Sequence, residues 1–205
     1  MATIAQIITD VTGETRRPDL ATRIERAVKN AVLRLHQSEL FARDLQEGVI
    51  AGGPFTSAAP DSRYVIPVAS LPGFRLFSKF HDYDAASGVV GQEYSIEDNP
   101  NYSLNSFGAQ RTRMVRLVGS NIVVLAGDTV GSTRNFYASW YKDPDVSSTS
   151  ASTWITEKYQ YAVMWAAVAA IHRGNGKAEE ANTAQAEAMT EYNNILINNI
   201  TLQGR

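Results

Sequence analysis

The sequence predicts an α+β protein in which a helical bundle, made of an N-terminal helix and a C-terminal helical hairpin, bears an inserted antiparallel β lobe. Three patterns favour this fold class. Apolar residues recur at helical spacing in residues 19–38 and 153–198, short alternating segments fill 45–145, and Gly174-Asn175-Gly176 divides the second helical region. We expect a single domain with a helical part at 1–44 and 153–198, the β lobe at 45–145, and a C-terminal tail at 199–205.

The composition indicates a folded globular chain, and we expect it to carry no cofactor. Hydrophobic residues make up 44% of the 205 residues and charged residues 20%, which is typical of globular domains. The net charge of −2 argues against dedicated DNA binding, because such proteins use a basic surface to release counterions. The chain has no cysteine, which excludes disulfides, thiolate zinc sites and cysteine nucleophiles.

The N-terminus and the most apolar segment bear on localisation. Residues 1–10 have neither the charged start nor the long apolar stretch of a secretory signal. The apolar run from Tyr159 to Ile171 is shorter than the ~20 residues that a transmembrane helix needs. We therefore expect a buried helix there, no membrane contact, and a protein that stays in the cytoplasm.

Residues 19–38 form the first predicted helix. Pro18 and Asp19 suit a helix start, because proline lacks an N–H that would be unpaired there and aspartate complements the helix dipole. The apolar stripe consists of Leu20, Ile24, Ala27, Val28, Ala31 and Leu35. The opposite face is basic, with Arg23, Arg26, Lys29 and Arg34.

The central segment has the pattern of antiparallel strands. Tyr64, Ile66 and Val68 occupy alternate positions, as residues on one face of a strand do. Residues 111–118 and 121–125 are separated by Gly119-Ser120, which can adopt the positive φ of a two-residue hairpin turn. A further strand is expected over 135–141, where aromatic residues occupy both faces.

The C-terminal region predicts two consecutive helices after a Ser/Thr-rich connector. Thr153 or Thr156 can cap the first of them, which runs to Arg173. Gly174-Asn175-Gly176 accepts the left-handed geometry of a helix end, so the chain turns into a second helix over 177–198. Its inner stripe is Ala181, Ala184, Ala188, Tyr192 and Ile195, and the many alanines of both helices allow close approach of helix axes.

Few residues suggest catalysis or metal binding. The three histidines, His36, His81 and His172, lack metal-site spacing and are interpreted as two residues on helix surfaces and one in a strand. Five acidic residues cluster between candidate strands: Asp82, Asp84, Glu93, Glu97 and Asp98. Such carboxylates could serve a glycosidase, but acidic residues are also ordinary in turns. We therefore predict no enzyme and no metal site.

Charge differs between the predicted helices. The first helix is basic, whereas residues 177–205 include Glu179, Glu180, Glu187 and Glu191. Opposite charges could guide contacts between subunits, and we take Arg23, Arg26, Arg34, Glu180 and Glu187 as candidate interface residues. The alternative is that both faces are simply solvated, because exposed ion pairs contribute only ~0–1 kcal/mol each.

Five stretches of turn and packing residues occur in an order that indicates a protein family when they are taken together. They are Leu71-Pro72-Gly73-Phe74-Arg75, residues 121–128, residues 136–144, residues 154–170 and residues 174–181. Their order, from a basic helix through a β lobe to a helical hairpin, resembles the head-to-tail adaptor (connector, head completion) proteins of tailed bacteriophages. The resemblance covers most of the chain.

The resemblance implies a non-enzymatic structural protein of the virion. It implies a ring of about twelve identical subunits at the head–tail junction, assembled in the host cytoplasm and built by heterologous contacts. The ring would bind the portal protein on one side and tail tube or nozzle proteins on the other, with DNA passing through without sequence-specific binding. The implied portal-binding segment is Asn199, Ile200, Thr201, Leu202, Gln203, Gly204 and Arg205.

Two other functions stay open from the sequence. A virion-associated peptidoglycan hydrolase could use carboxylates of the β lobe such as Asp82 or Glu93. A receptor-binding tail module could stack sugars on Tyr83, Tyr94 and Tyr102, although scattered tyrosines more often cover strand faces.

Overall fold

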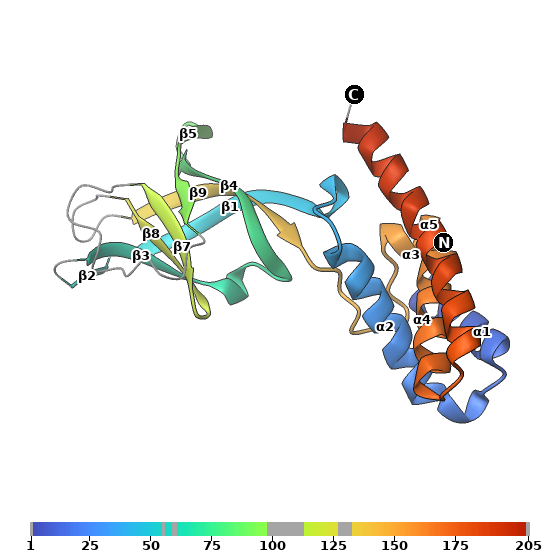
Figure 1. Cartoon of the computed structure of the whole chain (residues 1–205). Coiled ribbons are helices and arrows are strands. Elements are labelled where there is room, and N and C mark those ends of the chain that lie inside the picture. Colours follow the sequence, from blue (N-terminus) through green and yellow to red (C-terminus); the bar gives the residue numbers. More distant parts are fainter. Residues whose placement is uncertain (1, 55, 59–60, 98–112, 127–132, 204–205) are drawn as a thin grey trace. The chain divides into compact units, whose positions relative to one another are not determined.

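The computed structural model describes residues 2–54, 56–58, 61–97, 113–126 and 133–203 (Figure 1). Within these ranges it has five α-helices and nine β-strands, and the strands form two sheets. The chain divides into two compact units. The helical unit comprises Met1–Asp44 and Asp143–Arg205, and the β unit comprises Leu45–Lys142.

The expected fold class, a helical bundle with an inserted antiparallel β lobe, is wrong. The protein is a mixed α/β fold in which strands dominate between residues 45 and 142 and build a four-stranded and a five-stranded sheet. The five-stranded sheet is not purely antiparallel, because β6 (Ser95–Glu97) and β7 (Met114–Val118) pair in parallel. Alternation along the sequence identifies strands, but strand pairing depends on distant partners that a local pattern does not reveal.

Five helices make up the helical unit: α1 (Ile4–Thr15), α2 (Ala21–Gln37), α3 (Trp154–Lys158), α4 (Gln160–Gly174) and α5 (Ala178–Gln203). The short 3₁₀ helices η1 (Pro18–Leu20) and η2 (Ala42–Asp44) precede α2 and the β unit. Helix α4 packs against α1, α2 and α5, and it is the most apolar of the long helices. Its buried residues Val163, Ala167 and Ile171 form a core with Ile7 and Val28.

Helix α1 was not predicted from the sequence. Ile4, Ile7 and Val11 follow one another at three- and four-residue intervals, and all three are fully buried. Thr3 caps the helix by accepting a hydrogen bond from the backbone N–H of Gln6 at 3.3 Å. Arg16, in the left-handed region at φ 51°, ends it.

The C-terminal helices differ from expectation at two points. The helix predicted to run from Thr153 to Arg173 is two helices, because the backbone leaves helical geometry at Tyr159. The predicted cap is confirmed, since Thr153 and Thr156 form a reciprocal capping box. Helix α5 continues to Gln203, so the segment expected as a tail from residue 199 starts with helical backbone.

The β unit is built from strands of three to eleven residues. They are β1 (Leu45–Pro54), β2 (Thr56–Ala58), β3 (Asp61–Pro67), β4 (Phe74–Asp84), β5 (Val89–Glu93), β6, β7, β8 (Asn121–Leu125) and β9 (Thr133–Lys142). The strand orders are β1-β9-β4-β5 and β2-β3-β8-β7-β6. The predicted hairpin is confirmed: β7 and β8 pair in antiparallel fashion through Gly119, whose φ is 59°.

Aromatic side chains fill the core between the two sheets. Phe80 and Phe136 from the four-stranded sheet meet Tyr64 from the five-stranded sheet, and all three are fully buried. The rings of Tyr64 and Phe136 pack edge to face at 5.4 Å, as aromatic quadrupoles prefer. The β unit therefore has a hydrophobic core of its own.

A buried polar network lies where the chain leaves and re-enters the helical unit. Asp44, the last residue before β1, accepts a hydrogen bond from the indole N–H of Trp154 at 2.7 Å and lies 2.9 Å from Nδ1 of His36. The other ring nitrogen of His36 lies 3.1 Å from Oγ1 of Thr153, the cap of α3. We call these four residues the Asp44 network. It ties the end of α2 to the start of α3.

Replacing Asp44 by alanine should destabilise the helical unit by about 2–4 kcal/mol, because buried His36 and partly buried Trp154 lose a polar partner. Chemical denaturation followed by far-ultraviolet circular dichroism, which reports chiefly on the helices, measures this loss. The control is Asp19→Ala, which removes an exposed ion pair with Arg17 and should leave the unfolding midpoint nearly unchanged. Equal effects of the two substitutions would contradict this role of Asp44.

Candidate interaction surface

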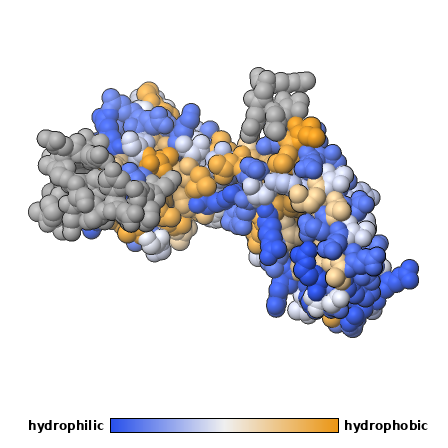
Figure 2. Space-filling model, viewed as in Figure 1, coloured by the Kyte–Doolittle hydropathy of each residue, from blue (hydrophilic) through white to orange (hydrophobic). Residues whose placement is uncertain are grey.

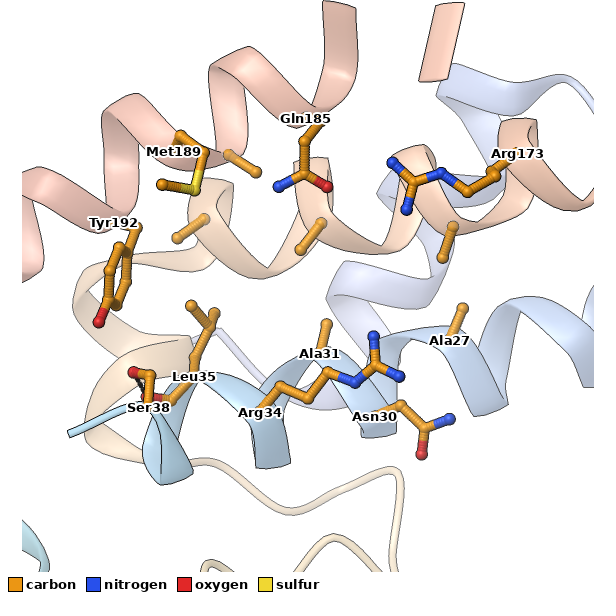
Figure 3. Close-up of a pocket in the computed structure, with 14 residues that line it drawn as sticks. Ala27, Asn30, Ala31, Arg34, Leu35, Ser38, Arg173, Gln185, Met189 and Tyr192 are labelled. Carbon is orange, nitrogen blue, oxygen red and sulfur yellow. Dashed lines mark hydrogen bonds between the residues drawn. The ribbon is translucent and has the colours of Figure 1, made fainter. Parts of the chain in front are cut away.

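A groove runs along the helical unit between α2 and α5, with α4 as its floor (Figure 3). Its cavity has a volume of about 320 Å³. We call it the α2–α5 groove, and its lining residues are Ala27, Asn30, Ala31, Arg34, Leu35, Ser38, Ala162, Ala166, Ala170, Arg173, Gln185, Ala188, Met189 and Tyr192. All of them belong to the helical unit.

Small side chains create this groove. Ala162, Ala166 and Ala170 lie one helical turn apart on α4, so a single stripe of that helix offers only methyl groups to the space above it. Met189 and Tyr192 of α5 form one rim, and the methionine is 48% exposed. The result is an apolar floor that the chain leaves open at Ala166 and Ala170, whereas Ala162 at its end is fully buried with Phe41 and Ile195.

Two arginines flank this apolar floor without partners. The side chains of Arg34 and Arg173 are exposed, and among the described residues neither makes a hydrogen bond or an ion pair through its guanidinium group. Figure 3 shows Arg34 reaching over the groove from α2 and Arg173 from the end of α4. A guanidinium group prefers a carboxylate, which it can bind through two parallel hydrogen bonds. The groove therefore suits an apolar surface that bears carboxylates.

The three candidate arginines of α2 have different surroundings. Arg23 donates a hydrogen bond to the side-chain oxygen of Asn175 at 3.2 Å and covers Gly174, where a Cβ atom would overlap its guanidinium group. Arg26 is exposed but is not part of the groove lining. Arg34 lines the groove. Of the three, the structure brings only Arg34 to this surface.

The two candidate glutamates lie on α5 outside the groove lining. Glu180 pairs with Lys177 at 3.5 Å. The hydrogen bond from its own backbone N–H holds the pKa of the Glu180 carboxyl below the ordinary value, and the charge of Lys177 acts in the same direction. Glu187 is exposed.

Sequence reasoning missed Arg173 as a groove residue, although it follows Ala170 by three residues and so continues the alanine stripe.

The candidate portal-binding segment is the end of α5. Asn199 is half-buried, and the backbone from Ile200 to Gln203 is helical, whereas Gly204 and Arg205 lie outside the described residues. The helix is anchored before this point, because Ile195 packs in a buried cluster with Phe41 and Ala162. Ile197 is 61% exposed, so apolar surface is available near the candidate segment.

The carboxylates of the β unit stabilise strands and turns. Asp82 accepts hydrogen bonds from the Tyr94 hydroxyl at 2.7 Å and from Arg134 at 2.5 Å. Asp84 accepts from the hydroxyl of Ser87, which lowers the pKa of its carboxyl. Glu93 lies in the exposed strand β5 and Glu97 in β6, while Asp98 is outside the described residues.

The tyrosines considered as sugar-stacking residues do not form an exposed platform among the described residues. Tyr94 is 2% exposed, so it cannot stack on a ligand in this structure, and Tyr83 lies 6.4 Å from the ring of Tyr137. Tyr102 is outside the described residues.

Interpreting His36 as a residue on a helix surface was wrong, because it is 2% exposed and belongs to the Asp44 network. His81 lies in β4 and His172 in the last turn of α4.

The residues that the structure describes include neither a metal-ligand cluster nor a membrane-spanning helix. No group of three or more His, Asp or Glu side chains is arranged to hold a metal ion among those residues. No described helix is both long enough and apolar enough to span a bilayer. Comparisons of the sequence with protein-family models and with curated proteins found no match.

Replacing Asp82 by alanine tests whether this carboxylate is structural or catalytic. We expect the β unit to lose about 1–3 kcal/mol of stability, because Tyr94 and Arg134 lose a shared acceptor. Hydrogen exchange of the backbone amides of β4 and β9, read peptide by peptide, reports on this unit, and Asp84→Ala in the exposed turn is the matched control. Cell-wall zymography of the wild-type chain should show no clearing. Clearing that Asp82→Ala abolishes, while the fold is retained, would establish a hydrolase instead.

Proposed function

We propose that this chain is a structural subunit of a head-to-tail adaptor ring in a tailed bacteriophage. In this function it joins the portal to tail tube or nozzle proteins and lines the channel through which DNA leaves the head. The observation that carries the proposal is the α2–α5 groove, an apolar surface flanked by two arginines without partners. Such a surface fits a protein partner.

The shape of the groove favours a helix as its occupant. Helices α2, α4 and α5 supply two walls and a floor, so one added helix would pack against all three of them. An alanine floor lets a docking helix approach closely, at the short end of the usual 8–10 Å separation of helix axes. Grooves between helices commonly bind the apolar face of a partner helix.

The distribution of charge and apolar surface supports a role in assembly. Hydrophilic side chains cover much of the visible helical surface in Figure 2, with apolar patches between them. Tyr161, Met189 and Ile197 are large apolar or aromatic residues of this unit that stay exposed in the isolated chain. Aromatic residues, methionine and arginine are enriched in protein interfaces, so these positions suit a subunit that is covered on assembly.

The net charge and the order of segments support the particular assembly. A ring that DNA must pass through should not hold the phosphate backbone, and a chain with a net charge of −2 lacks the excess of basic residues that would do so. The resemblance of the ordered stretches to phage adaptors then selects this assembly among structural proteins. The proposal assigns no catalytic residue.

Light scattering of the wild-type chain mixed with the portal protein of its phage should give a complex whose mass corresponds to a ring of the chain on the portal. Arg34→Glu should reduce ring formation at least about tenfold, because it places a carboxylate in a groove that we expect to receive carboxylates. Arg26→Glu makes the same charge change on the same helix outside the groove and should assemble normally. Failure of the wild-type chain to bind the portal would refute the adaptor function.

Deleting residues 199–205 should leave a folded chain that binds the portal weakly. Helix α5 is held by Ile195 and by residues before it, so circular dichroism should change little. A deletion that starts at Ile195 should also destabilise the helical unit, because it removes a side chain buried against Phe41. Unchanged portal binding by the shorter deletion would exclude residues 199–205 as the contact.

A further inference from the structure

A second depression lies on the helical unit, between α1 and α4. Its α1 wall is a single stripe of the helix, made of Gln6, Thr9, Asp10, Gly13 and Glu14. We call these residues the α1 stripe. Among the described residues, neither Asp10 nor Glu14 makes a hydrogen bond or an ion pair through its carboxylate. The stripe therefore presents two unpaired negative charges, one helical turn apart.

The two depressions lie on opposite faces of α4. Ala162, Ala166 and Ala170 line the α2–α5 groove, whereas Tyr161 and Met164 line the depression beside α1. At 3.6 residues per turn, these two sets point in directions roughly 170° apart around the helix axis. A single subunit thus presents an arginine-flanked groove on one side of α4 and a carboxylate-bearing helix on the other.

The depression beside α1 also has features of an interface. Tyr161 is 54% exposed although it lies on the most apolar long helix of the chain. Gly13 lies inside α1, where glycine costs about 1 kcal/mol relative to alanine. A Cβ atom at Gly13 would meet nothing within 4 Å, so the packing of the chain itself does not require glycine there.

We propose that copies of this chain pack head to tail, with the α1 stripe of one copy in the α2–α5 groove of the next. Asp10 and Glu14 of one copy then face Arg34 and Arg173 of the next, so each charge that is unpaired in the isolated chain gains an opposite partner. Tyr161 of the first copy packs beside the alanine floor of the second. This contact specifies the neighbour interaction of the ring under the proposed function.

A second copy fits the groove for three reasons. Two unpaired arginines match two unpaired carboxylates, and both pairs lie on α-helices of the same unit. Thr9 and Gly13 are small, so α1 can approach the alanine floor closely. The two surfaces differ and lie on opposite sides of α4, which produces the heterologous contact that generates rings or filaments.

Disulfide trapping tests this contact directly, because the chain has no native cysteine. Thr9→Cys lies in the α1 stripe and Gln185→Cys lines the groove. Under mild oxidation, a mixture of the two single variants should form covalent dimers, whereas either variant alone should not. A mixture of Thr22→Cys, exposed on α2, with Gln185→Cys is the matched control. Dimers no more abundant than in this control would overturn the contact.

Charge reversal provides a test that does not depend on cysteine chemistry. The variants Asp10→Lys/Glu14→Lys and Arg34→Glu/Arg173→Glu should each self-associate at least about tenfold more weakly than the wild-type chain, and mixing them should restore association. Failure of the mixture to associate, while each variant stays folded, would also overturn the contact.

The two proposals can fail separately. Portal-bound rings of the wild-type chain without the Thr9–Gln185 cross-link would support the adaptor function and overturn this contact. The cross-link without any binding to the portal would support the contact and overturn the adaptor function.

Discussion

The buried carboxylate of Asp44 is the interaction on which the helical unit depends. It joins His36 at the end of α2 to Trp154 at the start of α3, two segments that are more than a hundred residues apart in the sequence. Between them the chain forms the whole β unit. Because a buried carboxylate is costly without partners, the network favours one arrangement of these segments. Helix α4 follows α3 directly, so the position of α4, which forms the floor of the groove, depends on this arrangement.

Helix α4 contributes one side to the core of the helical unit and another side to the α2–α5 groove. One side of the helix buries Val163, Ala167 and Ile171, whereas its alanine stripe faces the groove. Alanines are small enough that α2 and α5 can flank the helix without filling the space above it. In the proposed contact between copies, the unpaired arginines beside the groove bind the unpaired carboxylates of α1 in the neighbouring copy.

Local patterns predicted the individual elements better than their assembly. The hairpin through Gly119 and the cap at Thr153 depend on neighbouring residues, and both are confirmed. The fold class was wrong, because the separation of strands into two sheets depends on contacts between distant residues such as Tyr64 and Phe136. The burial of His36 was missed for the same reason, since its partner Thr153 is distant in sequence. Of the five candidate interface residues, Arg34 alone lies in the groove.

Electron cryomicroscopy of tailed-phage virions that contain this chain would test the proposed adaptor function most directly. We expect the helical and β units to fit density in a ring between the portal and the tail, with the α1 stripe of each copy against the α2–α5 groove of its neighbour. A map in which the head–tail junction is fully accounted for by other proteins would contradict the account.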